Sequence, residues 1–199
     1  MSKVSISLDR VDWIEAALTR LISGGIDNVR IEALARDLKV TKGSFYWHFK
    51  THQELLDALI EHWEKSATGN AILAVEEAGG TPVERLRHMS KITIRNFGNF
   101  LPLELALRDW GRREPKVWQA IKRIDKQRID FTRELFEEIH GDTEQAEVSA
   151  WMFYSLFLGD NLIAAENKKL GHEKMLWRAI DTLTNTDQVS PIITDSEDV

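Results

Sequence analysis

The stretch IEALARDLKVTKGSFYWHF, residues 31–49, decides how this sequence is interpreted. Its apolar residues have the spacing of two short helices, Ile31 to Leu38 and Thr41 to His48, joined by a tight turn. The side chains expected to face the core are Leu34, Ala35 and Leu38 from the first helix and Phe45 and Phe49 from the second. This pattern predicts a helix-turn-helix.

The tip of the second helix has the composition of a helix that enters the major groove of DNA. Thr41 is a natural N-cap, and Gly43 and Ser44 are small enough for the backbone to approach the base edges. The basic and hydroxyl groups nearby suit guanine edges and backbone phosphates. The residues predicted from this pattern to contact DNA are Thr41, Lys42, Gly43, Ser44, Tyr46, Trp47, His48 and Lys50.

A purely structural role for the aromatic residues is the alternative. Packing accounts for Phe45 and Phe49, but the adjacent Tyr46 and Trp47 point to different faces of a helix. At least one of these two side chains must therefore be exposed. We interpret Trp47 first, and Tyr46 second, as a DNA contact.

The composition is that of an ordinary globular protein with an uneven charge distribution. The 199 residues include 43% hydrophobic and 29% charged residues, and the net charge is −6. Residues 30–50 nevertheless contain five basic and two acidic side chains, a local charge of +3. The absence of cysteine excludes disulfides and thiol catalysis. No apolar run is long enough to span a membrane, and Met1 to Asp9 does not resemble a secretory signal, so we expect a cytoplasmic protein.

Helical spacing continues through the remaining sequence and predicts an all-α chain of about nine helices. The first helix should end at Gly24-Gly25, and a Thr51–Glu54 capping box should open a helix that runs to about Ala78. A second capping box, Thr81 to Glu84, should open the next helix. One further helix is expected to start at Pro102, and the next to run from Pro115 to His140-Gly141. Another should span Glu144 to Asn167, and the last should follow Gly171.

Three functional regions follow from this pattern. Residues 1–52 are predicted to form the helix-turn-helix domain, and residues 53–184 a helical bundle for effector binding and dimerisation. Residues 185–199 are expected to form a disordered acidic tail.

The segment Lys42–Lys50, followed by Leu55-Leu56, resembles the DNA-binding domain of the TetR family of transcription regulators, and the resemblance covers residues 9–63. It implies an all-α homodimer that binds DNA through its third helix and releases it when a small molecule binds the larger domain. Lys39 and His52 stand where this family commonly has glycine and a phosphate-binding lysine. Arg30 replaces the usual Ser or Thr cap and is a predicted phosphate contact.

A homodimer is also indicated by the segment Ala150–Leu158, which is apolar on nearly every face. A partner subunit is the simplest cover for such a helix, and two-fold symmetry predicts a palindromic operator. The predicted dimer interface comprises Trp151, Tyr154, Leu158, Gly159, Leu162, Leu176 and Ile180.

An effector pocket is predicted where aromatic and polar residues coincide in the larger region. Its candidate lining residues are His88, Thr93, Asn96, Phe97, Phe100, Trp110, Trp118 and Tyr154. This lining favours a small apolar or aromatic ligand. We expect a repressor in which that ligand shifts the helix after the helix-turn-helix and changes the spacing of the two DNA-reading heads.

Two other classes of function remain as alternatives. A helical interaction protein without DNA binding is one, and a metal-dependent helical-bundle enzyme is the other. The sequence contains only one Glu-x-x-His motif, Glu137 to His140, and neither a P-loop nor a Gly-x-Gly-x-x-Gly motif. We therefore predict no enzymatic activity, no cofactor and no metal.

Overall fold

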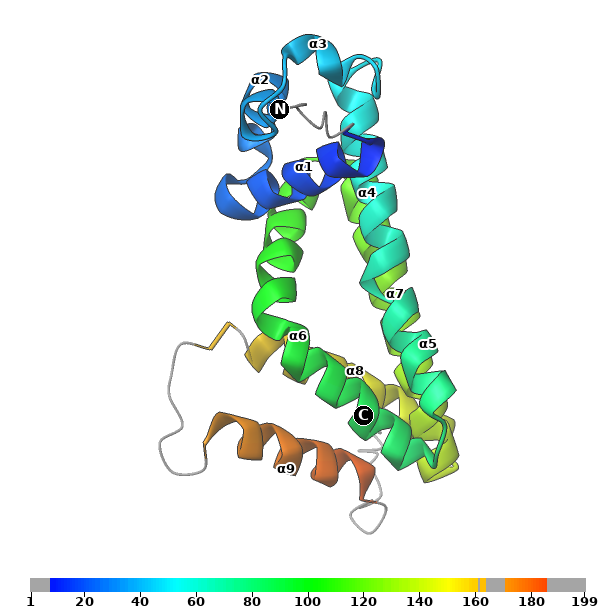
Figure 1. The fold of residues 1–199 in the computed structure, drawn as a ribbon. Helices are drawn as coiled ribbons and strands as arrows, with labels where there is room; N and C mark the ends of the chain where they lie inside the picture. The colour runs from blue at the N-terminus through cyan, green and yellow to red at the C-terminus, as the bar shows by residue number, and fades with distance from the viewer. Residues whose placement is uncertain (1–7, 161, 164–170, 186–199) are drawn as a thin grey trace, which may run out of the picture. The chain divides into compact units, whose positions relative to one another are not determined.

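The computed structural model describes residues 8–160, 162–163 and 171–185, and within these residues every regular element is a helix (Figure 1). The predicted all-α class with about nine helices is confirmed. The helices are α1 (Arg10–Gly24), α2 (Ile31–Asp37), α3 (Lys42–Phe45), α4 (His52–Ala67), α5 (Gly69–Ala78), α6 (Pro82–Gly111), α7 (Pro115–His140), α8 (Thr143–Asp160) and α9 (His172–Thr184), with a short 3-10 helix η1 (Ile26–Asn28) after α1.

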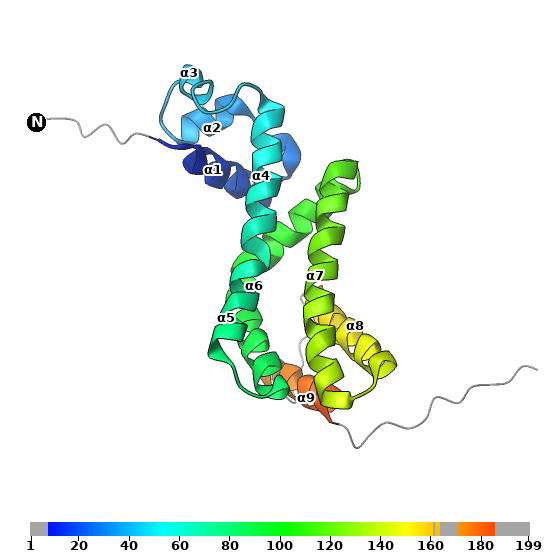
Figure 2. The same cartoon turned by 90° about the vertical axis from the view of Figure 1, so that its right-hand side faces the viewer.

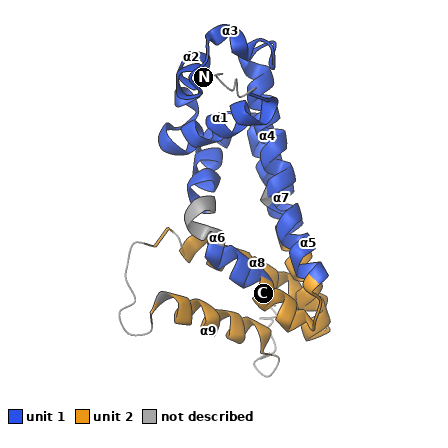
Figure 3. Cartoon of the chain, viewed as in Figure 1, with its two compact units in different colours: residues 1–77, 89–128 blue, residues 78–88, 129–199 orange. Residues whose placement is uncertain are grey.

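The chain divides into two compact units (Figure 3). The first contains residues 1–77 and 89–128, and the second contains residues 78–88 and 129–199. Helices α6 and α7 therefore contribute residues to both units. The functional division predicted after residue 52 follows a different criterion and stays a prediction.

Helices α1, α2 and α3 gather around the N-terminal part of α4 (Figures 1 and 2). Their core is aromatic: Trp13 meets Phe45 edge to face at 5.3 Å between ring centroids, and Phe45 stacks on Phe49 at 5.4 Å. All three rings are buried, as are Leu34 and Leu59. Full burial of each such side chain contributes roughly 1.5–3 kcal/mol, so this small domain has a substantial core.

The ends of α1 follow from local sequence. The Asp9 carboxylate accepts hydrogen bonds from the amides of Val11 and Asp12, and the Asp12 carboxylate accepts one from the Asp9 amide. This reciprocal capping box fixes the start of α1. At the other end Gly25 has φ +72°, a conformation that favours glycine, so the predicted end at Gly24-Gly25 is confirmed.

The helix predicted from Thr51 to about Ala78 is wrong, because it breaks at Thr68. Helix α4 ends at Ala67, and α5 begins at Gly69. The Ser66 hydroxyl donates to the carbonyls of His62 and Trp63 at 2.9 and 3.3 Å, and such side-chain bonds compete with the helix backbone. Ser66 and Gly69 together account for a break that apolar spacing alone did not reveal.

The helix start predicted at Pro102 is also wrong, because α6 continues through this residue from Pro82 to Gly111. A proline inside a helix removes one backbone hydrogen bond, and packing against neighbouring helices must compensate for it. The predicted starts at Pro82 and Pro115 are confirmed. The Thr81–Glu84 capping box is confirmed as well: the Thr81 amide donates to Glu84 at 2.8 Å, and the Glu84 amide donates to Thr81 at 3.3 Å.

Helix α8 begins as predicted but ends at Asp160 rather than near Asn167. Leu162 and Ile163 are not helical, and residues 161 and 164–170 lie outside the described residues. The second unit has its own aromatic core, in which Phe153 contacts Phe136 at 5.9 Å and Phe157 at 4.9 Å. Residues 186–199, most of the predicted tail, also lie outside the described residues. None of the described helices is long and apolar enough to cross a membrane.

Candidate nucleic-acid interface

The turn before α3 places this helix at the surface of the N-terminal domain. Lys39 has φ +56°, while its amide donates to the Arg36 carbonyl at 3.1 Å and the Val40 amide donates to the Ala35 carbonyl at 2.9 Å. These two bonds and the left-handed residue form a Schellman ending for α2. A non-glycine residue in this conformation costs roughly 1–2 kcal/mol, which is why glycine is common at such a position.

Helix α3 is shorter than the predicted Thr41 to His48, because regular α-helix ends at Phe45. The chain continues in tighter turns, with the amides of Tyr46, Trp47 and His48 donating to carbonyls three residues earlier at 3.2, 3.3 and 2.9 Å. Thr41 occupies the N-cap position with an extended backbone, but its hydroxyl makes no capping hydrogen bond. The predicted N-cap position of Thr41 is therefore confirmed, although its side chain does not cap the helix.

The residues after Thr41 separate into buried and exposed side chains. Phe45 and Phe49 lie in the core, while Trp47 is 88% exposed and Tyr46 is 53% exposed. Lys42, Gly43 and Lys50 are also exposed, and Ser44 and His48 are half-buried. The segment thus exposes aromatic and basic side chains while Phe45 and Phe49 anchor it in the core. Such an arrangement suits contact with DNA bases and phosphates.

Lys42 forms an ion pair with a neighbouring helix. Its ammonium forms an ion pair with the Glu32 carboxylate of α2 at 2.5 Å, and both side chains are largely exposed. The hydrogen bond lowers the pKa of Glu32 and raises the pKa of Lys42. Lys42 therefore stays charged, and because exposed pairs are weak it can exchange Glu32 for a phosphate at small cost.

One predicted site residue, Arg30, and one residue that departs from the family pattern, His52, bind backbone carbonyls just before α2. The Arg30 guanidinium donates through Nε to the Asp27 carbonyl at 2.8 Å, and Arg30 provides no side-chain cap. His52 Nε2 lies 2.7 Å from the Val29 carbonyl oxygen. The Arg30 side chain remains exposed, so it keeps the position of a candidate phosphate contact.

Arg10 and Glu54 join the end of this segment to α1 and α4, and sequence patterns predicted Glu54 only as a capping residue and did not reveal Arg10. Arg10 Nη1 donates to the His48 carbonyl at 2.8 Å and to Glu54 Oε1 at 3.0 Å. Glu54 Oε2 accepts the Lys50 amide at 2.8 Å, and the Thr51 hydroxyl accepts the Glu54 amide at 3.1 Å. The predicted Thr51–Glu54 box is thus half wrong, because Glu54 caps the amide of Lys50 rather than that of Thr51.

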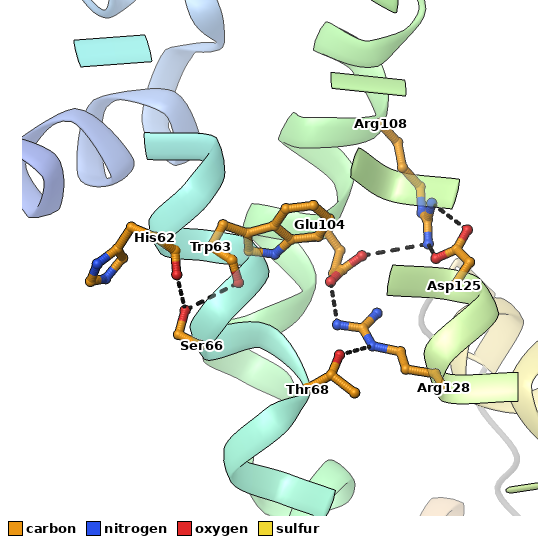
Figure 4. Close-up of polar contacts among 8 residues, drawn as sticks. All are labelled: His62, Trp63, Ser66, Thr68, Glu104, Arg108, Asp125 and Arg128. Atoms are coloured by element: carbon orange, nitrogen blue, oxygen red, sulfur yellow. Dashed lines mark hydrogen bonds and ion pairs between the residues drawn. The ribbon is translucent and has the colours of Figure 1, made fainter. Parts of the chain in front are cut away.

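A buried cluster of charged side chains lies at the other end of α4 (Figure 4). Arg128 of α7 donates through Nη2 to Glu104 of α6 at 2.9 Å and through Nε to the Thr68 hydroxyl at 3.1 Å. Arg108 binds both carboxylate oxygens of Asp125, at 3.1 and 2.8 Å, and lies 3.5 Å from Glu104 Oε2. The cluster connects the α4–α5 break to α6 and α7.

The indole of Trp63 lies beside this cluster (Figure 4). Its Nε1 is buried and has no hydrogen-bond acceptor among the residues that the structure describes. Buried indole N–H groups usually find a partner. The indole N–H of Trp63 is therefore a buried hydrogen-bond donor without an acceptor among the described residues, and it lies beside the charged cluster.

The predicted effector-pocket residues are distributed over both units. Thr93, Trp110 and Trp118 belong to the first unit, where Trp110 is buried and Trp118 is exposed, while His88 and Tyr154 belong to the second. The side chains of Asn96, Phe97 and Phe100 lie outside the described part of the structure. The pocket stays a prediction.

The predicted dimer residues fall into two groups. Trp151 and Leu162 are exposed, together with Val148, Met152 and Ile163. Tyr154, Leu158 and Gly159 are half-buried. Leu176 and Ile180, in contrast, are buried within the chain itself, so they are part of its core rather than a free surface.

The N-terminal domain matches a known family. Residues 14–59 match the family model of bacterial regulatory proteins of the tetR family. A segment of 54 residues is 43% identical to the tetracycline repressor protein class G of Vibrio anguillarum, covering 27% of this chain and 26% of that protein. The chain thus spans about a quarter of the length of this relative.

Solved structures resemble a larger part of the chain. A TetR-family transcriptional regulator from Bordetella parapertussis has a TM-score of 0.65 at 13% identity and covers 92% of this chain and 98% of that one. A putative transcriptional regulator from Saccharomonospora viridis, solved with choline, has a TM-score of 0.68 at 15% identity over 87% and 94%. At such identities the likeness shows the fold alone. The similarity to the tetR family of bacterial regulatory proteins is thus carried by residues 14–59.

Proposed function

We propose that this protein is a transcription repressor that binds a palindromic DNA operator as a homodimer and releases it when a small apolar or aromatic effector binds. The observation that supports this most directly is the segment Lys42–Lys50, whose exposed aromatic and basic side chains stand on a buried aromatic core. The domain that carries them is of the tetR type. Such a protein acts on chromosomal DNA, which places it in the cytoplasm.

The DNA-contacting residues divide by role. Lys42, Tyr46 and Lys50 are proposed to contact phosphates, with Lys42 also able to donate to a guanine. Gly43, Ser44 and Trp47 are proposed to face the base edges. Gly43 and Ser44 lie in the first turn of α3, and the Trp47 side chain is the most exposed aromatic side chain of the segment. Arg30, Thr41 and His48 are proposed to contact the DNA backbone beside these residues.

Dimerisation is supported by the apolar side chains that α8 leaves exposed. Val148, Trp151 and Met152 are each about half exposed, and Leu162 and Ile163 follow shortly after the helix. A cluster of large apolar side chains on a surface marks an interaction site. We propose that the same surface of a second copy covers it, together with Tyr154, Leu158 and Gly159, which gives the two-fold symmetry that a palindromic operator requires.

The response to an effector is proposed to pass through α4. This helix begins beside the DNA-contacting segment and ends at the buried charge cluster around Arg128. An effector shifts such a helix only by binding one of its positions more tightly than the other. The structure solved with choline is an example of a similar fold holding a small molecule.

The experiment is selection of bound duplexes from a random DNA library, followed by sequencing. We expect enrichment of two inverted half-sites whose centres lie about one helical turn, or a multiple of it, apart. The Lys42→Ala, Tyr46→Ala, Lys50→Ala triple variant should lose this enrichment while keeping its helical circular dichroism signal. Enrichment of no motif by the wild-type protein would leave a helical interaction protein as the better proposal.

A further inference from the structure

We propose that Arg10 and Glu54 are positioning residues for DNA binding: they hold the segment from Trp47 to Lys50 in its DNA-contacting orientation without touching DNA themselves. This inference rests on the proposed function. Arg10 also lies before the residues that the family model matches, 14–59, so the match says nothing about it.

Arg10 contacts the segment in two ways. Its Nη1 donates to the main-chain carbonyl of His48 at 2.8 Å, and its guanidinium carbon lies 4.2 Å from the centre of the Phe49 ring. A guanidinium over a ring is attracted by the negative face of the π system. Arg10 is thereby fixed to both the backbone and the core side chain that follow Trp47.

Glu54 completes the connection from the other side. One carboxylate oxygen accepts Arg10 at 3.0 Å, and the other accepts the main-chain amide of Lys50 at 2.8 Å. The His48 carbonyl and the Lys50 amide, which flank Phe49, are thus bound to one ion pair. Because Arg10 is the first residue of α1 and Glu54 lies in the first turn of α4, the pair ties the segment to both helices.

The rival explanation is that Arg10 is itself a phosphate contact, since its side chain is 47% exposed. The two explanations predict opposite effects for Glu54→Gln. If Arg10 binds phosphate, the Glu54 carboxylate competes with DNA, and its neutralisation should tighten binding. If the pair positions the segment, the same change replaces one acceptor oxygen by an NH2 group, so that a single neutral oxygen remains for the Lys50 amide and Arg10. Binding should then weaken although a negative charge has been removed.

The first arm of the test measures the affinity of Arg10→Gln, Arg10→Lys and Glu54→Gln for the duplex enriched by selection, and for a scrambled duplex. We expect each variant to lose about five- to tenfold in affinity for the selected duplex, because a charge-assisted hydrogen bond is lost and tenfold corresponds to about 1.4 kcal/mol. Binding to the scrambled duplex should change less than twofold. Lysine should not rescue Arg10, because a compact ammonium lacks the planar group that lies over the Phe49 ring.

Arg123 and Glu64 provide the matched controls. They form an ion pair at 2.8 Å between α7 and α4, remote in sequence from the DNA-contacting segment. Arg123→Gln and Glu64→Gln alter the net charge as the test variants do, and we expect them to leave the affinity within twofold. Losses equal to those of Arg10→Gln and Glu54→Gln would attribute the effect to net charge and overturn the proposal.

The salt dependence separates positioning from phosphate contact. Each phosphate contact contributes about 0.9 to the slope of log affinity against log salt concentration. Arg10→Gln should keep the wild-type slope if Arg10 positions the segment. A slope that falls by about one, a rescue by Arg10→Lys, or tighter binding by Glu54→Gln would each overturn the proposal.

A measurement without DNA keeps this inference distinct from the proposed function. Hydrogen exchange of the Lys50 amide should be faster in Arg10→Gln and Glu54→Gln than in the wild type, and unchanged in the two controls. If the wild type binds no duplex, the proposed function fails, and the exchange data still report on the ion pair. Unchanged Lys50 exchange in Glu54→Gln would overturn the inference itself.

Discussion

An ion pair with arginine lies at each end of α4, and the Arg10–Glu54 pair is far more exposed to water than the Arg128–Glu104 pair. At the N-terminal end the side chains of Arg10 and Glu54 are 47% and 35% exposed. At the C-terminal end the side chains of Arg128 and Glu104 are 14% and 2% exposed. The same chemistry therefore has different consequences at the two ends.

Exposure makes the N-terminal pair adjustable, because an exposed ion pair contributes at most about 1 kcal/mol and its partners find water when separated. The buried pair behaves differently. Removal of Arg128 leaves the buried Glu104 carboxylate with only the 3.5 Å contact to Arg108, so breaking this pair costs more than breaking the exposed one. The comparison therefore predicts that the pair at the N-terminal end of α4 is cheap to break and that the pair at the C-terminal end is costly to break.

The largest effect is expected from breaking the buried pair on one side. Arg128→Met should destabilise the protein by up to about 3–5 kcal/mol, because the buried Glu104 carboxylate then keeps only its 3.5 Å contact with Arg108. The double variant Arg128→Met, Glu104→Leu should recover most of that loss. Urea denaturation followed by circular dichroism measures both, and a single variant that costs less than about 1 kcal/mol would remove the contrast between the two ends.

A smaller effect is expected from the Thr68 hydroxyl, which accepts Arg128 Nε at 3.1 Å. Thr68→Val keeps the side-chain shape and should cost about 1–3 kcal/mol, because a buried charged donor loses its acceptor. Thr19, whose hydroxyl donates to the Glu15 carbonyl within α1, is the control. Equal losses of stability for Thr68→Val and Thr19→Val would show that Arg128 does not depend on this contact.

At the N-terminal end the cap should matter less than the buried cluster. Thr51→Ala should cost about 1 kcal/mol, since the Glu54 amide loses the hydroxyl that accepts it. Thr41→Ala is a matched control, because Thr41 is also an N-cap residue but its hydroxyl makes no capping bond. We expect the control to change the unfolding free energy by less than about 0.5 kcal/mol. The reverse order would refute the assignment of these caps.

The smallest effect is a pH dependence of stability that belongs to the exposed end. The hydrogen bond from the Lys50 amide, followed by that from Arg10, lowers the pKa of the Glu54 carboxyl below its usual value. A lowered folded-state pKa stabilises the protein above the unfolded-state pKa, and this stabilisation is lost as pH falls through the folded-state value. Thermal unfolding below about pH 4.5 should therefore be less pH-dependent for Glu54→Gln than for the wild type. Parallel pH profiles for the two proteins would contradict the shift.

Sequence patterns predicted the parts of the molecule that depend on neighbours along the chain. Phe45, Phe49 and Leu34 are buried as the helical spacing requires, and Gly25 ends α1. The Thr81–Glu84 box forms because both partners lie within one helical turn.

The remaining parts depend on contacts between distant residues. Arg10 meets Glu54 from 44 residues away, and Arg128 meets Thr68 from 60 residues away, distances at which local spacing carries no information. The α4–α5 break combines Ser66 and Gly69, each of which a helix tolerates alone. The Glu54 carboxylate accepts the amide of Lys50 instead of the predicted amide of Thr51.

The central claim, that the segment Lys42–Lys50 reads DNA, is tested most directly by fluorescence anisotropy of the wild-type protein. The probe is the intergenic duplex upstream of its own gene, with a scrambled duplex of equal length as control, across a series of salt concentrations. The account predicts a preference of roughly a thousandfold or more for the intergenic duplex and an affinity that falls steeply with salt. Absence of binding to both duplexes at low salt would contradict it.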